Sequence, residues 1–96
     1  MTVDRLGTER WATTSVATKT TVTVQITPTL LLAANIERLD FLINNTSAVT
    51  VTIGYNDTDI IEPIPAGATY TADTYFGPIY ATVTASTADV IVTEHA

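Results

Sequence analysis

The sequence of 96 residues contains no cysteine, one histidine, one tryptophan and only four lysine and arginine residues. The lack of cysteine excludes disulfide bonds, cysteine-ligated zinc and thiol catalysis. A membrane-spanning helix needs about 20 consecutive apolar residues, and no run of that length is present. A small domain without disulfides often gains stability by forming oligomers or by docking on a larger structure.

Positive charge is scarce relative to negative charge. Ten aspartate and glutamate residues give a net charge of −6. Phosphate backbones and anionic membranes bind clustered cations, so we expect neither nucleic acid nor membrane as a partner. The first residues, MTVDRLGTERW, lack the apolar segment of a secretory signal, which predicts synthesis in a cytoplasm.

Threonine is the most unusual component, at 21 of the 96 residues. Together with valine and isoleucine it makes the chain rich in β-branched residues, which suit pleated sheet. Val22, Val24 and Ile26 alternate with polar residues, and this period of two predicts a strand that Pro28 ends. The length suits one domain.

Residues 1–17 show no sustained period and hold three apolar and two basic side chains suited to contact with a partner. We interpret them as an extended N-terminal arm that precedes a β domain at 18–96, with a frayed terminus as the alternative. The candidate contact residues of the arm are Val3, Arg5, Leu6, Arg10 and Trp11.

The segment NIERLDFLINNTSAVTVTIGY, residues 35–55, contains two alternating apolar runs. They flank a turn at 44–47, so the pattern predicts an antiparallel hairpin of two neighbouring strands. The preceding TLLLAANIER, residues 29–38, is rich in good helix formers and leaves a short helix open beside a strand.

The second half of the chain predicts further short strands. Pro63 and Pro65 favour an edge strand or a connecting segment, and Gly67 favours a turn. Residues 78–84 and 89–94 read as two last strands. The sequence therefore predicts an all-β fold, a small antiparallel β-sandwich or barrel of six to seven short strands.

Catalytic chemistry finds little support. His95 is next to last, where we expect no packed neighbours to orient it for acid–base work. Ser15, Ser47 and Ser86 lack the G-x-S-x-G context of a nucleophile. We therefore expect no enzyme activity and no cofactor.

One group of acids is a candidate for a metal site. Asp57, Asp59 and Glu62, with Asn56, could offer oxygen ligands to Ca²⁺. Their spacing does not match an EF-hand loop, and the sequence favours a solvated turn with no metal.

Tyr75 and Phe76 lie in the loop-like TADTYFGP. Aromatic side chains are enriched at interface cores, although most of them in a small β domain belong to its own core. Both residues are candidates for contact with a partner.

Residues 33–94 resemble a small all-β module of tailed-bacteriophage virion proteins. The pattern consists of an Ala-Asn near an arginine, an apolar strand ending in Asn, a Val-x-Ile-Gly strand, a Pro-x-x-Gly turn before an aromatic residue, a Gly-x-Ile-Tyr-Ala strand and a terminal strand with acidic ends. The matching positions are Asn35, Arg38, Phe41, Ile43, Asn44, Val51, Ile53, Gly54, Pro65, Gly67, Tyr70, Gly77, Ile79, Tyr80, Asp89, Val90 and Val92.

The resemblance implies a structural protein on the capsid surface of a virion, namely a capsid decoration (cement) protein. The implied partners are the major capsid protein and further copies of this chain, as a trimer or a dimer. A tail, fibre or neck module is the alternative from the same family, and a carbohydrate-binding or host-surface module is the alternative from another class. A cement protein that binds the assembled shell stabilises it by mass action.

Overall fold

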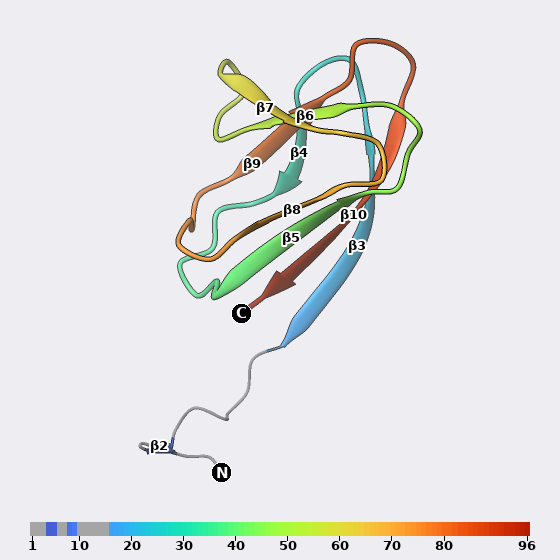
Figure 1. Cartoon of the computed structure of the whole chain (residues 1–96). Helices are drawn as coiled ribbons and strands as arrows, with labels where there is room; N and C mark the ends of the chain where they lie inside the picture. Colours follow the sequence, from blue (N-terminus) through green and yellow to red (C-terminus); the bar gives the residue numbers. More distant parts are fainter. Residues whose placement is uncertain (1–3, 6–7, 10–15) are drawn as a thin grey trace.

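Eight strands form two antiparallel sheets of four, packed face to face as a β-sandwich (Figure 1). The computed structural model describes residues 4–5, 8–9 and 16–96. The long sheet has the order β3-β10-β5-β8, with bounds Ala17–Val24, Ala88–His95, Asp40–Asn45 and Thr69–Ala72. The short sheet has the order β4-β9-β6-β7, with bounds Thr29–Leu32, Ile79–Thr82, Val51–Gly54 and Ile60–Ile64. The predicted all-β antiparallel fold is confirmed, with eight strands where six or seven were expected.

Two further strands of two residues each lie near the N-terminus. β1 (Asp4–Arg5) pairs with β2 (Thr8–Glu9) in an antiparallel arrangement. The long sheet begins at Ala17, and Val16 already exchanges both backbone hydrogen bonds with Ala96 (2.9 and 3.1 Å). The last two residues assigned to the arm therefore belong to the sandwich, at the end where the C-terminus lies (Figure 1).

The core lies between the two sheets and follows the period of two. In β5, Phe41 and Ile43 are buried, whereas the residues between them are half-exposed. Val51 and Ile53 of β6 belong to the same core. Full burial of such a side chain contributes about 1.5–3 kcal/mol, and the alternation directs these contributions to one face of each strand.

The predicted hairpin between β5 and β6 is wrong. β5 pairs with β10 and β8 in the long sheet, and β6 pairs with β9 and β7 in the short sheet. Residues 46–50 therefore cross from one sheet to the other. Alternation fixes which side chains face the core but not the neighbour of a strand, so facing strands and adjacent strands have the same pattern.

The ambiguous segment 29–38 contains no helix. Thr29–Leu32 is the edge strand β4, which pairs with β9 with an irregularity between Leu30 and Leu32. The chain then turns at 35–38, where the Arg38 N–H donates to the Asn35 carbonyl (3.1 Å). Burial of Leu31 in the core outweighs helix propensity here.

The proline-rich segment is an edge strand, one of the two alternatives that the sequence left open. β7 carries Pro63 and pairs only with β6. Gly67 has a φ of 79° in the turn before β8, a conformation that glycine adopts without steric cost. Gly54 is the last residue of β6, and a Cβ there would lie 2.6 Å from the Cα of Ile60, the first residue of β7. Only glycine therefore fits where β6 and β7 meet.

Candidate functional site

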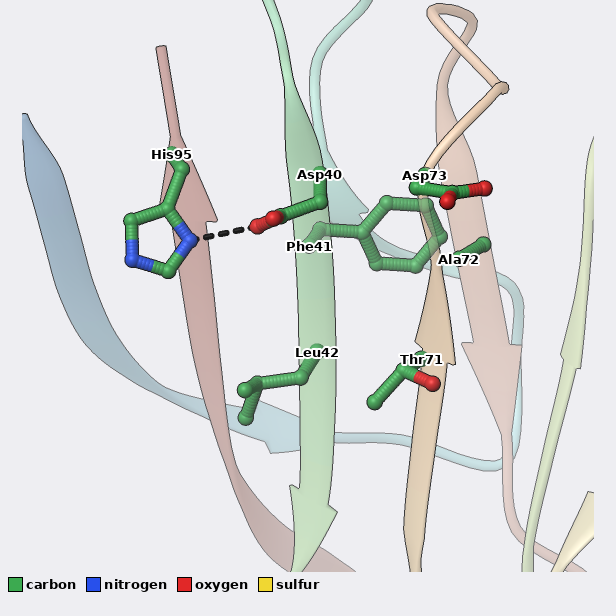
Figure 2. Close-up of a pocket in the computed structure, with 7 residues that line it drawn as sticks. All are labelled: Asp40, Phe41, Leu42, Thr71, Ala72, Asp73 and His95. Atoms are coloured by element: carbon green, nitrogen blue, oxygen red, sulfur yellow. Dashed lines mark hydrogen bonds and ion pairs between the residues drawn. The ribbon is translucent and has the colours of Figure 1, made fainter. Parts of the chain in front are cut away.

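A pocket of about 390 Å³ lies on the long sheet, at the end where the C-terminus lies (Figure 2). Because Phe41 and Ile43 face the core, Asp40 and Leu42 of β5 face outward. Neighbouring positions of β8 and β10 complete the pocket. The lining residues are Asp40, Phe41, Leu42, Thr71, Ala72, Asp73 and His95.

His95 is oriented by a neighbour, contrary to the expectation from its place near the chain end. The antiparallel register sets it opposite Asp40, and its Nδ1 forms a hydrogen bond with Asp40 Oδ1 (Figure 2). The carbonyl of His95 also accepts a hydrogen bond from the Leu39 N–H (2.7 Å). The sequence could not reveal this pair, because the two residues lie 55 positions apart and meet only through strand pairing.

The chemistry of the pocket favours contact with a cationic group. Asp40 and Asp73 offer carboxylate acceptors, and neither lysine nor arginine is among the lining residues. About half of the Asp40 side chain (49%) and a third of the His95 side chain (35%) are exposed, so water screens the pair.

Arg38 lies buried beside this end of the sandwich, with 2% of its surface exposed. Its Nε donates to Glu94 Oε2 (2.7 Å). The remaining nitrogens donate to the carbonyls of Tyr75 (3.0 Å), Gly77 (2.9 Å) and Ala33 (2.7 Å). Arg38 therefore ties the β4–β5 and β8–β9 connections to β10, a structural role that composition and periodicity did not indicate.

The predicted contact residues Tyr75 and Phe76 have different surroundings. The ring of Tyr75 packs against Tyr55 with centroids 4.6 Å apart, and its hydroxyl donates to the Pro78 carbonyl (2.9 Å). Burial raises the pKa of Tyr75. Phe76 is 47% exposed, so Phe76 is the freer of the two to meet a partner.

Tyr55 extends this aromatic cluster to the edge of the long sheet. Its hydroxyl shares a hydrogen bond of 2.7 Å with the hydroxyl of Tyr70 in β8. This hydrogen bond and burial together raise the pKa of Tyr70 to about 12. The hydroxyls of Tyr55 and Tyr70 thus link the residue that follows β6 to β8.

Four exposed apolar residues lie at the end of the sandwich where β3 begins. Val16 pairs with Ala96, and the Leu39 N–H bonds the adjacent His95. Phe76 is joined to the same turn, since its carbonyl accepts from the Asn35 N–H (2.8 Å). The arm-end surface, as we define it, consists of Val16, Ile36, Leu39 and Phe76, with Ile36 the most exposed at 86%.

The acids proposed for Ca²⁺ do not form a site. Within residues 16–96, no three histidine, aspartate or glutamate side chains are placed to hold a metal ion. Asn56 Oδ1 accepts from both the N–H and the hydroxyl of Thr58 (2.9 Å each). This turn occupies the amide oxygen that a cation would need.

The predicted arm residues lie largely outside the described residues. Val3, Leu6, Arg10 and Trp11 are among the positions that the structure does not describe, and Arg5 is described only as part of β1. Their role as contacts stays a prediction.

Within the described part of the chain, no helix has the length and hydropathy to cross a lipid bilayer. Comparison with models of protein families, with curated proteins and with solved structures gave no match.

Proposed function

We propose that this chain is a capsid decoration (cement) protein of a tailed-bacteriophage virion, which binds the outer surface of the assembled shell and stabilises it. The proposal rests on the resemblance over residues 33–94 and on the arm-end surface. That surface places exposed apolar side chains beside the start of β3, where the N-terminal residues join the sandwich.

The buried polar side chains support a structural role. Arg38 uses its donors on Glu94 and on three backbone carbonyls. Asn45, the other large buried polar residue, donates to the carbonyls of Val49 and Ile64. Both side chains are committed to holding connections in place, which suits a rigid scaffold that presents a binding surface.

The mechanism is thermodynamic. Ile36, Leu39 and Phe76 would lose water on contact with a shell, at about 25 cal/mol for each Å² of apolar surface removed. A protein that binds the assembled shell but not loose subunits shifts assembly by mass action. The arm residues Val3, Leu6 and Trp11 would add apolar contacts, and Arg5 and Arg10 would add cations.

The experiment that tests this role is the copy number of the chain in purified virus particles. Quantitative mass spectrometry against the major capsid protein should give one copy for each capsid subunit or for each three. A few copies per particle would instead place the chain in the tail, fibre or neck, and absence from particles would remove the virion role.

Matched variants test the surface. Ile36→Ser and Phe76→Ser should lower binding to particles that lack the chain by about tenfold or more, which corresponds to about 1.4 kcal/mol. Ile26→Ser and Ile61→Ser are the controls, because these residues (61% and 74% exposed) fall between Phe76 and Ile36 in exposure and lie away from the arm-end surface. Equal losses in all four variants would contradict a role for this surface.

A further inference from the structure

The four sheet edges of the sandwich differ in how well they are protected. β8 and β4 have only four residues, β4 pairs irregularly, and β7 contains Pro63. Short strands, irregular pairing and proline all hinder the addition of another strand. β3 has eight residues and pairs with β10 along its whole length without a register shift. Among the described strands, β3 is thus the long and regular edge.

The hydrogen-bonding groups at this edge follow from one observed pair. Val16 and Ala96 exchange both backbone hydrogen bonds. Bonded and non-bonded pairs alternate along antiparallel strands, so every second residue from Val16 bonds to β10. The residues between them direct their N–H and C=O groups toward the free edge, and these are Ala17, Lys19, Thr21 and Thr23.

We propose that β3 pairs with β3 of a second copy, antiparallel about a two-fold axis at Thr21, so that the two long sheets join into one. Thr21 would lie opposite Thr21 of the second copy, and Lys19 opposite the second copy's Thr23. Each of these pairs would exchange two backbone hydrogen bonds. Pairing would stop at Gln25, because its N–H bonds Thr29 Oγ1 (3.0 Å) and its carbonyl accepts from Val83 (3.1 Å).

Charge complementarity favours a second copy as the occupant in this register. Thr23 lies opposite Asp89 on β10, and its hydroxyl donates to Asp89 Oδ1 (2.7 Å). Lys19 of one copy would therefore lie across the joined sheet from Thr23 and then Asp89 of the other copy. At that spacing the lysine side chain can reach the Asp89 carboxylate. Lys19 and Thr23 of the same copy are about 13 Å apart along the strand, so the pairing of opposite charges arises only between copies.

Side-chain size also fits this pairing. Outward-facing Thr21 would meet the same residue of the second copy, and threonine–threonine cross-strand pairs are favourable. Lys19 is the only charged side chain in β3, and the register keeps the two copies of Lys19 apart. The edge thus lacks the repeated charges that usually prevent strand addition.

Sedimentation equilibrium of the full chain tests the proposal. The apparent mass should rise from 10.3 kDa toward twice that value between about 10 µM and about 1 mM, the range of a weak interface. Thr21→Pro removes an N–H that faces the free edge, a position where a strand tolerates proline. This variant should dimerise at least tenfold more weakly, with an unchanged circular dichroism spectrum.

A second set of variants keeps the test independent of proline. Thr21→Lys should weaken the dimer, whereas Thr50→Lys, at an exposed threonine in the crossing between the two sheets, should not. Lys19→Glu should weaken it as well, and Lys19→Glu combined with Asp89→Lys should restore it. A merely structural effect of either charge would not give this rescue.

Three results would overturn the proposal. They are a chain that stays monomeric at about 1 mM, a dimer that Thr21→Pro leaves intact, and a charge reversal that the second substitution does not rescue. A β3 dimer would form whether or not the chain decorates a shell, so its absence and the absence of the chain from virus particles are separate outcomes.

Discussion

The Arg38 side chain makes four hydrogen bonds at the end of the sandwich where β3 begins. A buried guanidinium is stable only when its charge and its donors are matched, and here Glu94 supplies the charge while three carbonyls accept. The side chain also lies over the Phe41 ring, 5.4 Å from its centroid, a favourable position for a cation. One residue therefore fixes the two loops that carry Ile36, Leu39 and Phe76 of the arm-end surface.

We expect Arg38→Met to lower the free energy of unfolding by about 3–5 kcal/mol, because the three carbonyls and the Glu94 carboxylate, with only 19% of its side chain exposed, would lose their partner. Urea denaturation at low micromolar concentration measures the loss. Lys19→Met is the matched control, since Lys19 is exposed on β3 and surface substitutions change stability by about 0.5 kcal/mol or less. Equal losses in the two variants would show that the guanidinium does not hold these loops.

The raised pKa of Tyr70 predicts that the fold loses stability in alkaline solution. Its hydrogen bond with Tyr55, and then burial, raise its pKa from 10.0 to about 12. A folded-state pKa above the unfolded value favours the protonated hydroxyl in the fold. The contribution is therefore complete below pH 10 and is lost as the pH rises from 10 through about 12.

Urea denaturation at several pH values above 9 would show this decline as a falling free energy of unfolding. Tyr70→Phe should make the decline shallower, because the variant lacks the hydroxyl whose pKa rises on folding. Absorbance of tyrosinate near 295 nm should follow the same titration. A slope that is the same in the wild type and Tyr70→Phe would assign the pH dependence elsewhere.

At the scale of elements, the crossing between β5 and β6 decides the topology. Asn45 ends β5 and donates from Nδ2 to the carbonyls of Val49 (2.8 Å), Ile64 (2.9 Å) and Pro65 (3.2 Å). Its Oδ1 accepts from the Ser47 N–H (3.1 Å). The Asn45 amide thus joins the end of β5, in the long sheet, to the end of β7, in the short sheet.

Asn45→Asp should destabilise the fold by about 3 kcal/mol or more, because a buried carboxylate would face carbonyls that it cannot donate to. Asn44→Asp is the matched control, since Asn44 Oδ1 is an acceptor for the Thr69 hydroxyl and a carboxylate keeps that role. Thermal and urea denaturation of the two variants would measure the difference. If Asn44→Asp proved the more harmful, the crossing would not depend on the Asn45 amide.

At the scale of the whole molecule, the net negative charge comes entirely from the β domain. Residues 1–17 contain Asp4, Glu9, Arg5 and Arg10, which sum to zero, so residues 18–96 carry the entire net charge of −6. Eight acids there face only Lys19 and Arg38, and Arg38 is buried with Glu94. The like charges within the folded domain therefore repel one another.

Screening of this repulsion should stabilise the fold. Raising sodium chloride from about 10 mM to about 500 mM shortens the Debye length from about 30 Å to a few Å. A gain of about 1 kcal/mol would raise the Tm by about 4–8 °C in a domain of this size. Differential scanning calorimetry at pH 7 would measure the shift, and a Tm that fell with salt would mean that attractive pairs dominate.

The agreement between sequence and structure follows the period of two. Alternation located β3 and β5, although β3 ends at Val24 and leaves Ile26 exposed. Pro63 limited its segment to an edge strand or a connection, because proline lacks an N–H. The hairpin at 39–55 failed because the same alternation serves strands that are adjacent and strands that face each other. His95 and Arg38 were misjudged or missed because their partners, Asp40 and Glu94, lie more than 50 positions away.

By itself, the sequence determined an all-β antiparallel fold, an acidic surface and a core of alternating β-branched residues. Alternation within a single strand is enough to show which of its side chains face the core. Only the tertiary structure decided which strands pair, which edge stays open and which loops Arg38 and Asn45 join. These depend on contacts between distant segments, where backbone hydrogen bonds are alike in every register and the packing of the whole core selects one arrangement.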